Sequence, residues 1–237
     1  MITVSIVSHK QLLLVKNLLD ELVNNSEVRI ILTINISEDE SVIKKYVNND
    51  RVLIVRNTQV KGFGENHNYA FSLSDSKYFL ILNPDVQIEA NIIDELTKTL
   101  AFTDTKLISP LSVTNTGSHN DNARMFPSIL TPFKRIIKKK SEYSFKEKKV
   151  YDVDWISGMF MLFESSLFRD IGGFDEQFFL YYEDVDICKR VHSTNERVLL
   201  TSQFKVKHHG ARESSKSIKY LLIHILSMIK YHLKHPI

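Results

Sequence analysis

The chain has 237 residues, 43% of them hydrophobic and 25% charged, which is typical of a globular protein long enough to bury a core. A single cysteine excludes a disulfide framework and a cysteine-rich zinc site, and glycine and proline are too few for a collagen-like or disordered chain. The sequence has no run of about 18 apolar residues, and its opening residues lack the pattern of a signal peptide. We therefore expect a protein of the reducing cytoplasm.

The formal net charge of +3 is unevenly distributed along the chain. Residues 134–150 carry eight Lys and Arg against two Glu, and residues 205–237 carry seven against one Glu, so each segment has a charge of +6. The rest of the chain is left with −9. Two basic segments on an acidic body indicate an anionic partner, such as a lipid surface, a diphosphate-bearing substrate or nucleic acid. For residues 134–150 alone, a solvated loop is the simpler interpretation.

The first half of the sequence alternates between apolar runs typical of buried strands and amphipathic runs typical of helices. The expected strands are Ile2–Val7, Val28–Ile34, Val52–Val55 and Tyr78–Leu82, and the expected helices are 11–24, 38–47, Glu65–Leu73 and 90–101. This alternation predicts βαβ units with right-handed crossovers and a mostly parallel sheet. A ligand is then expected at the carboxyl ends of the strands.

The second half is less regular and is expected to add a small antiparallel piece to the same core. The expected strands are Leu107–Val113, Gly158–Phe163, Arg197–Leu200 and Phe204–Lys207, and the expected helix is 183–192. Residues 114–150 are polar, basic and irregular. The predicted fold class is α/β, with a mostly parallel central sheet, helices on both faces and a small antiparallel addition.

Residues 213–237 are expected to contain an amphipathic, basic helix over 216–234. Its apolar stripe consists of Ile218, Leu221, Leu222, Ile225, Leu226, Ile229 and Leu233. Lys219, Lys230 and Lys234 flank this stripe. The pattern fits equally a helix that lies in a membrane interface and a terminal helix that packs on the core. The second basic segment favours the membrane.

The turn after the strand Tyr78–Leu82 is a candidate metal site. Asn83 and Pro84 end the strand, so that Asp85 points past the carboxyl edge of the sheet. A carboxylate there can hold a hard cation that also binds phosphate oxygens. An Asx-type turn is the alternative, and for this motif alone it is the simpler interpretation.

The segment Phe174–Arg190 places four aromatic residues directly before the carboxylates Glu183, Asp184 and Asp186. Carboxylates are favourable at the N-terminus of a helix, so helix capping is one interpretation. An aromatic wall beside carboxylates also describes a sugar pocket with a general base, because partial burial raises the pKa of a carboxylate.

Two further motifs are weaker. His208 and His209 follow the last expected strand, and because neighbours do not share a face, at most one points into a given site, where a neutral imidazole can bind a metal. The loop 62–68, GFGENHN, opens a helix whose free N–H groups suit a phosphate or a sugar hydroxyl. This loop is neither a dinucleotide-binding motif, since residue 67 is His, nor a P-loop.

In chain order, these motifs resemble family 2 glycosyltransferases of the GT-A fold, and most of all the bacterial rhamnosyltransferases that use dTDP-L-rhamnose in O-antigen or cell-wall assembly. The resemblance rests on IVSH at 6–9, Asn35 with Ser37 and Asp39, GFGENHN at 62–68, LNPD at 82–85, RMFP at 124–127, VDWISGMFML at 153–162, GGFDEQFFLYYEDVDICKR at 172–190 and HHG at 208–210. It covers nearly the whole chain and thins over 134–150 and after 212. The block 173–186 is its most specific part.

The resemblance also implies a role for individual residues. Contacts to the nucleotide would come from Ser8, Asn35, Gly62, Gly64, Asn68 and Asn83. Contacts to the donor sugar and the acceptor would come from Arg124, Trp155, Gly158 and Tyr182. Mg²⁺ or Mn²⁺ would be bound by Asp85 and His208, with His209 as the rival of His208. Asp184 would be the general base, with Glu183 beside it.

Two departures from the family pattern affect these roles. Ile34 stands where the usual Asp-Asn-x-Ser pattern has its Asp, which leaves the identity of the nucleotide open. Asn83 replaces the first acid of the Asp-x-Asp motif, so fewer protein carboxylates hold the metal. We therefore expect a weakly bound metal that arrives with the nucleotide diphosphate.

The resemblance implies an inverting, metal-dependent transferase that moves L-rhamnose from dTDP-rhamnose to a glycan on a polyprenyl diphosphate. It would act in surface polysaccharide synthesis, as a peripheral protein at the inner face of the cell membrane. Residues 1–212 would form the catalytic domain, with a nucleotide-binding half over about 1–113 and an acceptor-binding half over about 114–212.

Other functions stay open. A UDP-hexose or UDP-galactofuranose is an alternative donor. A sugar nucleotidyltransferase would need a glycine-rich phosphate loop, which Ile6–Lys10 lacks. The aromatic residues stand beside acids and are not interleaved with Lys and Arg, which argues against nucleic acid as a partner.

Overall fold

The computed structural model describes residues 1–89, 91–114, 117–118, 122–128, 145–146, 149–208 and 218–236. In these residues a nine-stranded sheet has the strand order β3-β2-β1-β4-β10-β6-β11-β5, and β8 pairs with β11. The strands of this sheet are β1 (Ile2–Ser8), β2 (Val28–Ile34), β3 (Val52–Arg56), β4 (Tyr78–Leu82), β5 (Val86–Gln87), β6 (Leu107–Val113), β8 (Val150–Asp152), β10 (Phe160–Glu164) and β11 (Leu199–His208).

Most strands of the sheet run in one direction. β1, β2, β3 and β4 are mutually parallel, and β6 and β11 share their direction. β5, β8 and β10 run the opposite way. A separate two-stranded sheet pairs β7 (Ala123–Arg124) with β9 (Trp155–Ile156) in antiparallel fashion. The prediction of a mostly parallel sheet with a small antiparallel addition is confirmed.

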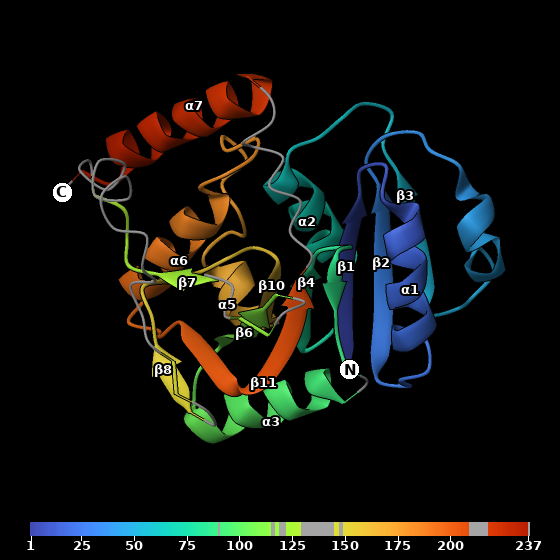
Figure 1. Ribbon diagram of the computed structural model, residues 1–237, viewed down its shortest axis with the longest axis horizontal. Coiled ribbons are helices and arrows are strands. Elements are labelled where there is room, and N and C mark those ends of the chain that lie inside the picture. The colour runs from blue at the N-terminus through green and yellow to red at the C-terminus, as the bar shows by residue number, and fades with distance from the viewer. Residues whose placement is uncertain are drawn as a thin grey trace.

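Helices cover both faces of the sheet, as predicted (Figure 1). The described helices are α1 (Leu12–Leu22), the 3₁₀ helix η1 (Glu40–Tyr46), α2 (Phe63–Ser72), α3 (Ile92–Thr103), α5 (Ser165–Asp170), α6 (Glu183–Ser193) and α7 (Ile218–Lys234). One core cluster joins α1, η1 and α3 to the sheet, and includes Leu96. A second cluster, on the other face, joins α2, α5 and α6 and includes Phe168 and Tyr231 of α7.

The apolar periodicity of the sequence explains these elements. The buried residues of α1 are Leu12, Val15, Leu18, Leu19 and Leu22, which recur every three or four positions and form one face. β4 instead buries the continuous run Phe79–Leu82, because helices cover both faces of the sheet around it.

The structure differs from the prediction where elements are short or interrupted. The two strands expected over Arg197–Leu200 and Phe204–Lys207 form one strand, β11, whose register shifts between Thr201 and Lys205. The polar residues between them therefore mark an irregularity in a continuous strand. The pattern also missed β5, β7, β8 and β9, which have two or three residues each, and the six-residue helix α5.

One edge of the sheet brings together the ends of strands from both halves of the chain. β10 pairs antiparallel with β4, so that Phe160 at the start of β10 lies opposite Leu82 at the end of β4. Because β1 and β2 are parallel to β4, their carboxyl ends lie at this same edge, where a ligand is expected. The proposed boundary between a nucleotide-binding half and an acceptor-binding half thus crosses a single sheet.

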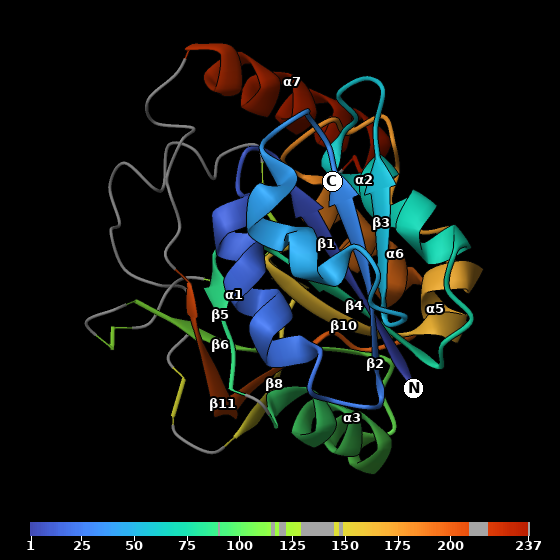
Figure 2. The same cartoon turned by 90° about the vertical axis from the view of Figure 1, so that its right-hand side faces the viewer.

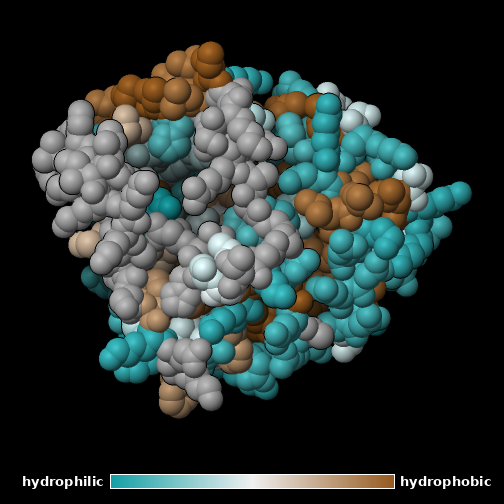
Figure 3. Space-filling view, viewed as in Figure 1, coloured by the Kyte–Doolittle hydropathy of each residue, from teal (hydrophilic) through white to brown (hydrophobic). Residues whose placement is uncertain are grey.

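The helix α7 lies at the end of the molecule toward which β1 and β3 point (Figure 2). Apolar side chains gather over it on the surface (Figure 3). Among the residues that the structure describes, no helix is both long and apolar enough to cross a bilayer.

Candidate active site

The turn after β4 brings Asp85 and His208 together. Asn83 donates its backbone N–H to the Met159 carbonyl (2.9 Å), and Val86 then pairs with His208 at the end of β11. This register leaves the Asp85 Oδ2 atom 3.2 Å from the His208 Nε2 atom, with both side chains partly exposed.

These two side chains fit a divalent cation as a pair of adjacent ligands. In an octahedral site with metal–ligand distances of about 2.1 Å, neighbouring ligand atoms lie about 3 Å apart, close to the separation of this carboxylate and imidazole. The described residues contain no group of three or more His, Cys, Asp or Glu that could hold a metal. A cation here would therefore need the oxygens of a ligand such as a diphosphate. His209 lies outside the described residues.

Asp184 stands in the first turn of α6 and points toward the start of β10. Its Oδ2 atom accepts the Gly158 N–H (3.1 Å), and its Oδ1 atom accepts the N–H of Val185 (2.9 Å). Burial raises the pKa of the Asp184 carboxyl, while these two N–H groups and the Arg124 charge oppose the shift. Asp184 is therefore a carboxylate whose position is fixed by two backbone hydrogen bonds and whose pKa is raised, and both properties suit a general base.

Glu183, one residue earlier, has a different environment. Its side chain is 5% exposed, and its Oε2 atom has no hydrogen-bond partner among the described residues. Burial, reinforced by the neighbouring Asp184 charge, raises the pKa of Glu183 well above its ordinary value. The pKa of Glu183 is thus raised well above its ordinary value, whereas at Asp184 two N–H groups and the Arg124 charge oppose the effect of burial.

Gly158 and Met159 join the two acidic sites. Gly158 donates its N–H to Asp184, and the next carbonyl, that of Met159, accepts the N–H of Asn83 in the Asp85 turn. A side chain at Gly158 would meet the Phe63 ring at 3.1 Å, so the start of α2 also reaches this point. The structure thus places the Asp85 turn and the N-terminus of α6 on either side of one dipeptide.

Arg124 and Trp155 lie on the neighbouring two-stranded sheet, where they are paired in register. The guanidinium of Arg124 lies 5.8 Å from the Trp155 ring centroid and lowers the pKa of Asp184 through its charge. Tyr182 forms the N-cap of α6, and its ring lies 5.4 Å from the Tyr231 ring of α7. These three predicted substrate residues surround the N-terminus of α6.

Ser8 ends β1 and Asn35 directly follows β2 at the same edge of the sheet, and both side chains form hydrogen bonds within the protein. The Ser8 hydroxyl donates to Glu38 (2.6 Å) and accepts the N–H of Gln11 (3.1 Å). The Asn35 amide binds the backbone of Lys61 in both directions, with its Nδ2 atom 3.0 Å from the Lys61 carbonyl. Their contact with a nucleotide stays a prediction.

Gly62, Gly64 and Asn68 hold α2 against a later segment of the chain. A Cβ atom on Gly62 would lie 2.9 Å from the Phe179 carbonyl oxygen, and one on Gly64 would lie 2.6 Å from Phe174 Cβ. Asn68 accepts the N–H of Phe174 and donates to its carbonyl, both at 2.8 Å. These glycines therefore allow a close approach of two segments of the chain, and their contact with a nucleotide stays a prediction.

Sequence reasoning missed Lys234 and His235, which bind the acidic start of α6. Their partners are far away in the sequence, and no periodic pattern connects them. A hollow of about 360 Å³ lies apart from these residues, beside the start of α3 and the irregular part of β11, and none of the predicted site residues lines it.

Comparisons with known proteins agree with the resemblance. The model of the family described as "Glycosyl transferase family 2" matches residues 3–172. The chain is 28% identical to the rhamnosyltransferase WbbL of Escherichia coli (strain K12), over 98% of this chain and 92% of that protein. It is 29% identical to an N-acetylglucosaminyl-diphospho-decaprenol L-rhamnosyltransferase of Mycobacterium tuberculosis, over 59% of this chain and 49% of that one.

Solved structures resemble the fold. The mannosyltransferase PcManGT from Pyrobaculum calidifontis, in complex with GDP-Man and Mn²⁺, superposes on the whole of this chain with a TM-score of 0.70 and 13% identity. GalNAc-T7 with UDP, GalNAc and Mn²⁺ matches 88% of this chain with a TM-score of 0.66 and 16% identity. This chain spans 65% and 43% of the length of these two proteins.

Proposed function

Because the chain belongs to glycosyl transferase family 2 and has a GT-A fold, we propose that it transfers one sugar from a nucleotide diphosphate to an acceptor hydroxyl, with inversion. The observation that carries this proposal is the shared dipeptide Gly158–Met159, which binds the Asp184 carboxylate on one side and the Asp85 turn on the other. Such a site can remove a proton and bind a diphosphate within one reacting complex.

In the proposed reaction Asp184 accepts the proton of the acceptor hydroxyl as its oxygen attacks the anomeric carbon. The bond from that carbon to the diphosphate oxygen breaks, and the diphosphate leaves with the electron pair. The charge of Arg124 favours the ionised form of Asp184, and Glu183 stays protonated, so a second negative charge does not form beside the base. A single displacement of this kind inverts the configuration at the anomeric carbon.

Asp85 and His208 would hold the divalent cation, Mg²⁺ or Mn²⁺. When bound, such an ion neutralises the charge of a leaving diphosphate. Asn83 contributes by fixing the turn, because its N–H binds Met159 and its carbonyl accepts the N–H of Val86 (3.3 Å).

We propose L-rhamnose from dTDP-rhamnose as the transferred sugar and a polyprenyl-diphosphate-linked glycan as the acceptor. The support is the names of the two relatives, both rhamnosyltransferases, of which one acts on a diphospho-decaprenol acceptor. A relative from Haloferax volcanii, 26% identical over 82% of this chain and 62% of that protein, is named a hexosyltransferase, so another nucleotide hexose is the alternative donor.

We further propose that residues 1–212 form the catalytic domain and that α7 rests on the inner face of an anionic membrane. The apolar stripe of α7 faces outward, and its members Ile218, Leu221, Leu222, Ile225, Leu226, Ile229 and Leu233 are 38% to 78% exposed. The side of α7 that touches the protein instead buries Ser227 and the ring of Tyr231, which belongs to the second core cluster. An apolar face and a charge of +6 over residues 205–237 match a lipid surface with negative headgroups.

A screen of nucleotide sugars for protection against thermal unfolding tests the donor and the metal together. dTDP-rhamnose should raise the Tm more than UDP- or GDP-sugars do, and Mn²⁺ should add to the shift. In Asp85→Ala the added shift from Mn²⁺ should vanish, while the shift from nucleotide alone remains. Protection by no nucleotide sugar would overturn the proposed function, and an unchanged Mn²⁺ effect in Asp85→Ala would overturn the ligand assignment.

A further inference from the structure

The side of α7 that touches the protein packs on the segment that leads into the catalytic helix. The Ser227 hydroxyl donates to the Leu180 carbonyl (2.8 Å), and the Lys230 ammonium donates to the Gln177 carbonyl (2.6 Å). The His224 ring lies 5.2 Å from the Tyr181 ring and 5.4 Å from the Tyr182 ring. The helix is therefore attached to residues 177–182 along its length.

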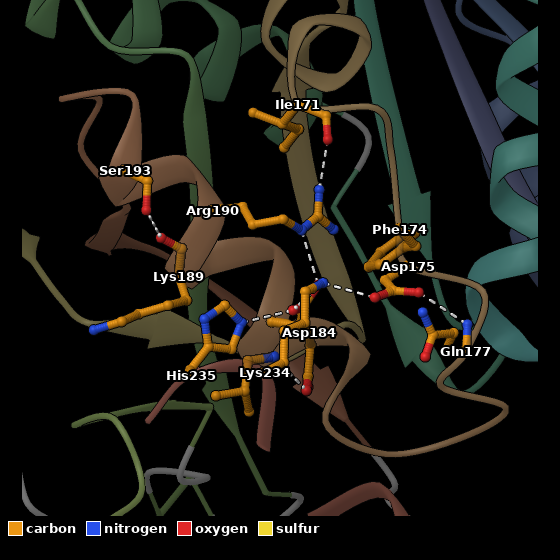
Figure 4. A network of polar contacts seen from close by, with 12 residues as sticks. Ile171, Phe174, Asp175, Gln177, Asp184, Lys189, Arg190, Ser193, Lys234 and His235 are labelled. Atoms are coloured by element: carbon orange, nitrogen blue, oxygen red, sulfur yellow. Dashed lines mark hydrogen bonds and ion pairs between the residues drawn. The ribbon is translucent and has the colours of Figure 1, made fainter. Parts of the chain in front are cut away.

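The end of α7 is bound to α6 through a buried carboxylate. Asp186 has no exposed surface, and its oxygens lie 2.8 Å from Arg190 Nε, 2.7 Å from Lys234 Nζ and 2.8 Å from His235 Nε2. Lys234 also pairs with Asp175 at 2.6 Å. Figure 4 shows Lys234 and His235 converging with Arg190 on the first turn of α6.

This cluster adjoins a turn whose backbone needs support. Tyr181 and Tyr182 have φ angles of 68° and 69°, a left-handed conformation that bulky residues adopt only when their surroundings hold them there. Asp186 donates its N–H to the Tyr182 carbonyl (2.9 Å), and the Tyr182 ring lies against Tyr231 of α7. Asp184 stands between these two anchored residues.

We propose that Lys234 and His235 are positioning residues for Asp184. By pairing with the buried Asp186 they hold the Tyr181–Tyr182 turn, and the turn sets the direction of the Asp184 carboxylate. Lys234 bridges Asp175 and the buried Asp186. Its loss removes the link to Asp175 and leaves Asp186, among the described residues, with Arg190 and His235 alone. Both ends of the segment that holds the turn then lose a charged partner. The inference rests on the proposed function, since it assigns Asp184 the role of base.

The test compares Lys234→Met with Lys98→Met, which removes the same charge and an exposed ion pair to Glu95 on α3. Transfer from dTDP-rhamnose to a synthetic farnesyl-diphosphate-linked N-acetylglucosamine is measured in detergent, so that membrane binding plays no part. In Lys234→Met, kcat should fall at least tenfold while the Kd for dTDP changes less than twofold. Lys98→Met should match the wild type, and Lys234→Arg should recover at least half of kcat.

Hydrogen exchange gives a readout that needs no activity. Amides within 174–186 should exchange at least tenfold faster in Lys234→Met and in His235→Gln than in the wild type, while those of β1 and β4 should not change. Wild-type kcat in Lys234→Met, or unchanged exchange over 174–186, would overturn the positioning role. A wild type that binds dTDP-rhamnose and transfers no sugar would count against the proposed function alone, because the exchange result still tests the turn.

Discussion

At the scale of single residues, the site depends on the difference between Asp184 and Glu183. Both stand in the first turn of α6, where the helix dipole favours negative charge. Asp184 accepts two backbone N–H groups, whereas the Oε2 atom of Glu183 is buried without a partner among the described residues. Burial favours the neutral form of both acids, and it raises the pKa of Glu183 well above the ordinary value. In the proposed reaction Asp184 is therefore the base, and the shift of Glu183 limits the negative charge beside it.

Asp184→Asn should remove transfer and leave nucleotide binding intact. The amide keeps the size of the side chain but cannot take a proton, and a general base contributes about 10²–10⁴-fold to a rate. We expect kcat to fall by that factor, with the Kd for dTDP within twofold of the wild type by calorimetry. Asp50→Asn, the same exchange at an exposed residue in the turn before β3, serves as the control. Turnover near that of the wild type in Asp184→Asn would exclude Asp184 as the base.

Glu183→Gln should stabilise the protein at neutral and higher pH. The pKa of Glu183 is raised above its ordinary value of 4.5, so the folded chain binds more protons than the unfolded chain between that value and the folded-state pKa. The free energy of unfolding of the wild type therefore falls as pH rises through this range. The glutamine side chain does not titrate, so the variant lacks this decrease. The Tm difference should grow from pH 4.5 to pH 8, by roughly 2–4 °C per kcal/mol recovered.

The sign of that trend decides the interpretation of Glu183. Equal Tm differences at pH 4.5 and pH 8 would mean that Glu183 ionises normally in the folded protein. Glu21 on α1 is a useful comparison, because it is exposed to solvent. Glu21→Gln should leave the Tm nearly unchanged at both pH values and should leave kcat unchanged.

The sequence predicts those site residues that are marked by their immediate neighbours in the chain. Asp85 follows a buried strand directly and Asp184 opens a helix behind an aromatic run, so both stand out in a linear reading. Their arrangement around Gly158 depends on the antiparallel pairing of β10 with β4, which no local pattern specifies. The link between Lys234 and Asp186 is absent from the sequence pattern for the same reason.

At the scale of elements, the glycines of α2 allow the helix to contact residues 174–179. Gly64→Ala places a methyl group 2.6 Å from Phe174 Cβ, so either α2 or that segment must move. Such overpacking costs about 1–3 kcal/mol, although alanine is favoured over glycine in an exposed helix by about 1 kcal/mol. We expect Gly64→Ala to lower the free energy of unfolding in urea by about that cost.

Ser72→Ala on the exposed side of the same helix is the matched control, and it should stay within about 0.5 kcal/mol of the wild type. A stabilised Gly64→Ala would mean that α2 stands away from Phe174. The loss should also reach the site, because the Phe63 ring at the start of α2 occupies the space that a Cβ atom on Gly158 would need, at 3.1 Å.

Long periodic elements were predictable, and short ones were not. The strands over residues 2–82 and the helices α1, α3 and α6 follow from apolar periodicity, because each buries a face that repeats several times. β5 and β9 have two residues each, too few for any period, and they exist only because β11 and β7 lie beside them. β5 begins directly after Asp85 and β9 ends two residues before Gly158, so these missed strands lie beside predicted site residues.

At the scale of the whole molecule, α7 connects the proposed membrane surface to the catalytic edge. The sequence left open whether this helix packs on the core or on lipid. In the structure one side of α7, with Ser227 and Tyr231, packs on the protein. The apolar side faces outward (Figure 3). A continuous exposed apolar stripe of this kind marks a surface that binds a lipid or a protein partner.

If lipid covers this stripe, the full chain should float with vesicles of phosphatidylglycerol in a density gradient. It should float less with neutral phosphatidylcholine, because each basic residue near an anionic surface contributes about 1 kcal/mol. The double variant Leu222→Glu with Leu226→Glu should stay at the bottom of the gradient. Both side chains are exposed, so the exchange should leave folding intact, which circular dichroism can verify.

Phe102→Glu provides the matched control. Among the described residues Phe102 is the most exposed large apolar side chain, at 92%, and it lies on α3 at the other end of the molecule. This variant should float like the wild type, because its apolar side chain is not part of the α7 stripe. A second copy of the chain is the rival occupant of the stripe. Two observations together would assign the stripe to that copy and exclude the membrane. The wild type and Phe102→Glu would both fail to float, and sedimentation would show a wild-type dimer that the double α7 variant converts to a monomer.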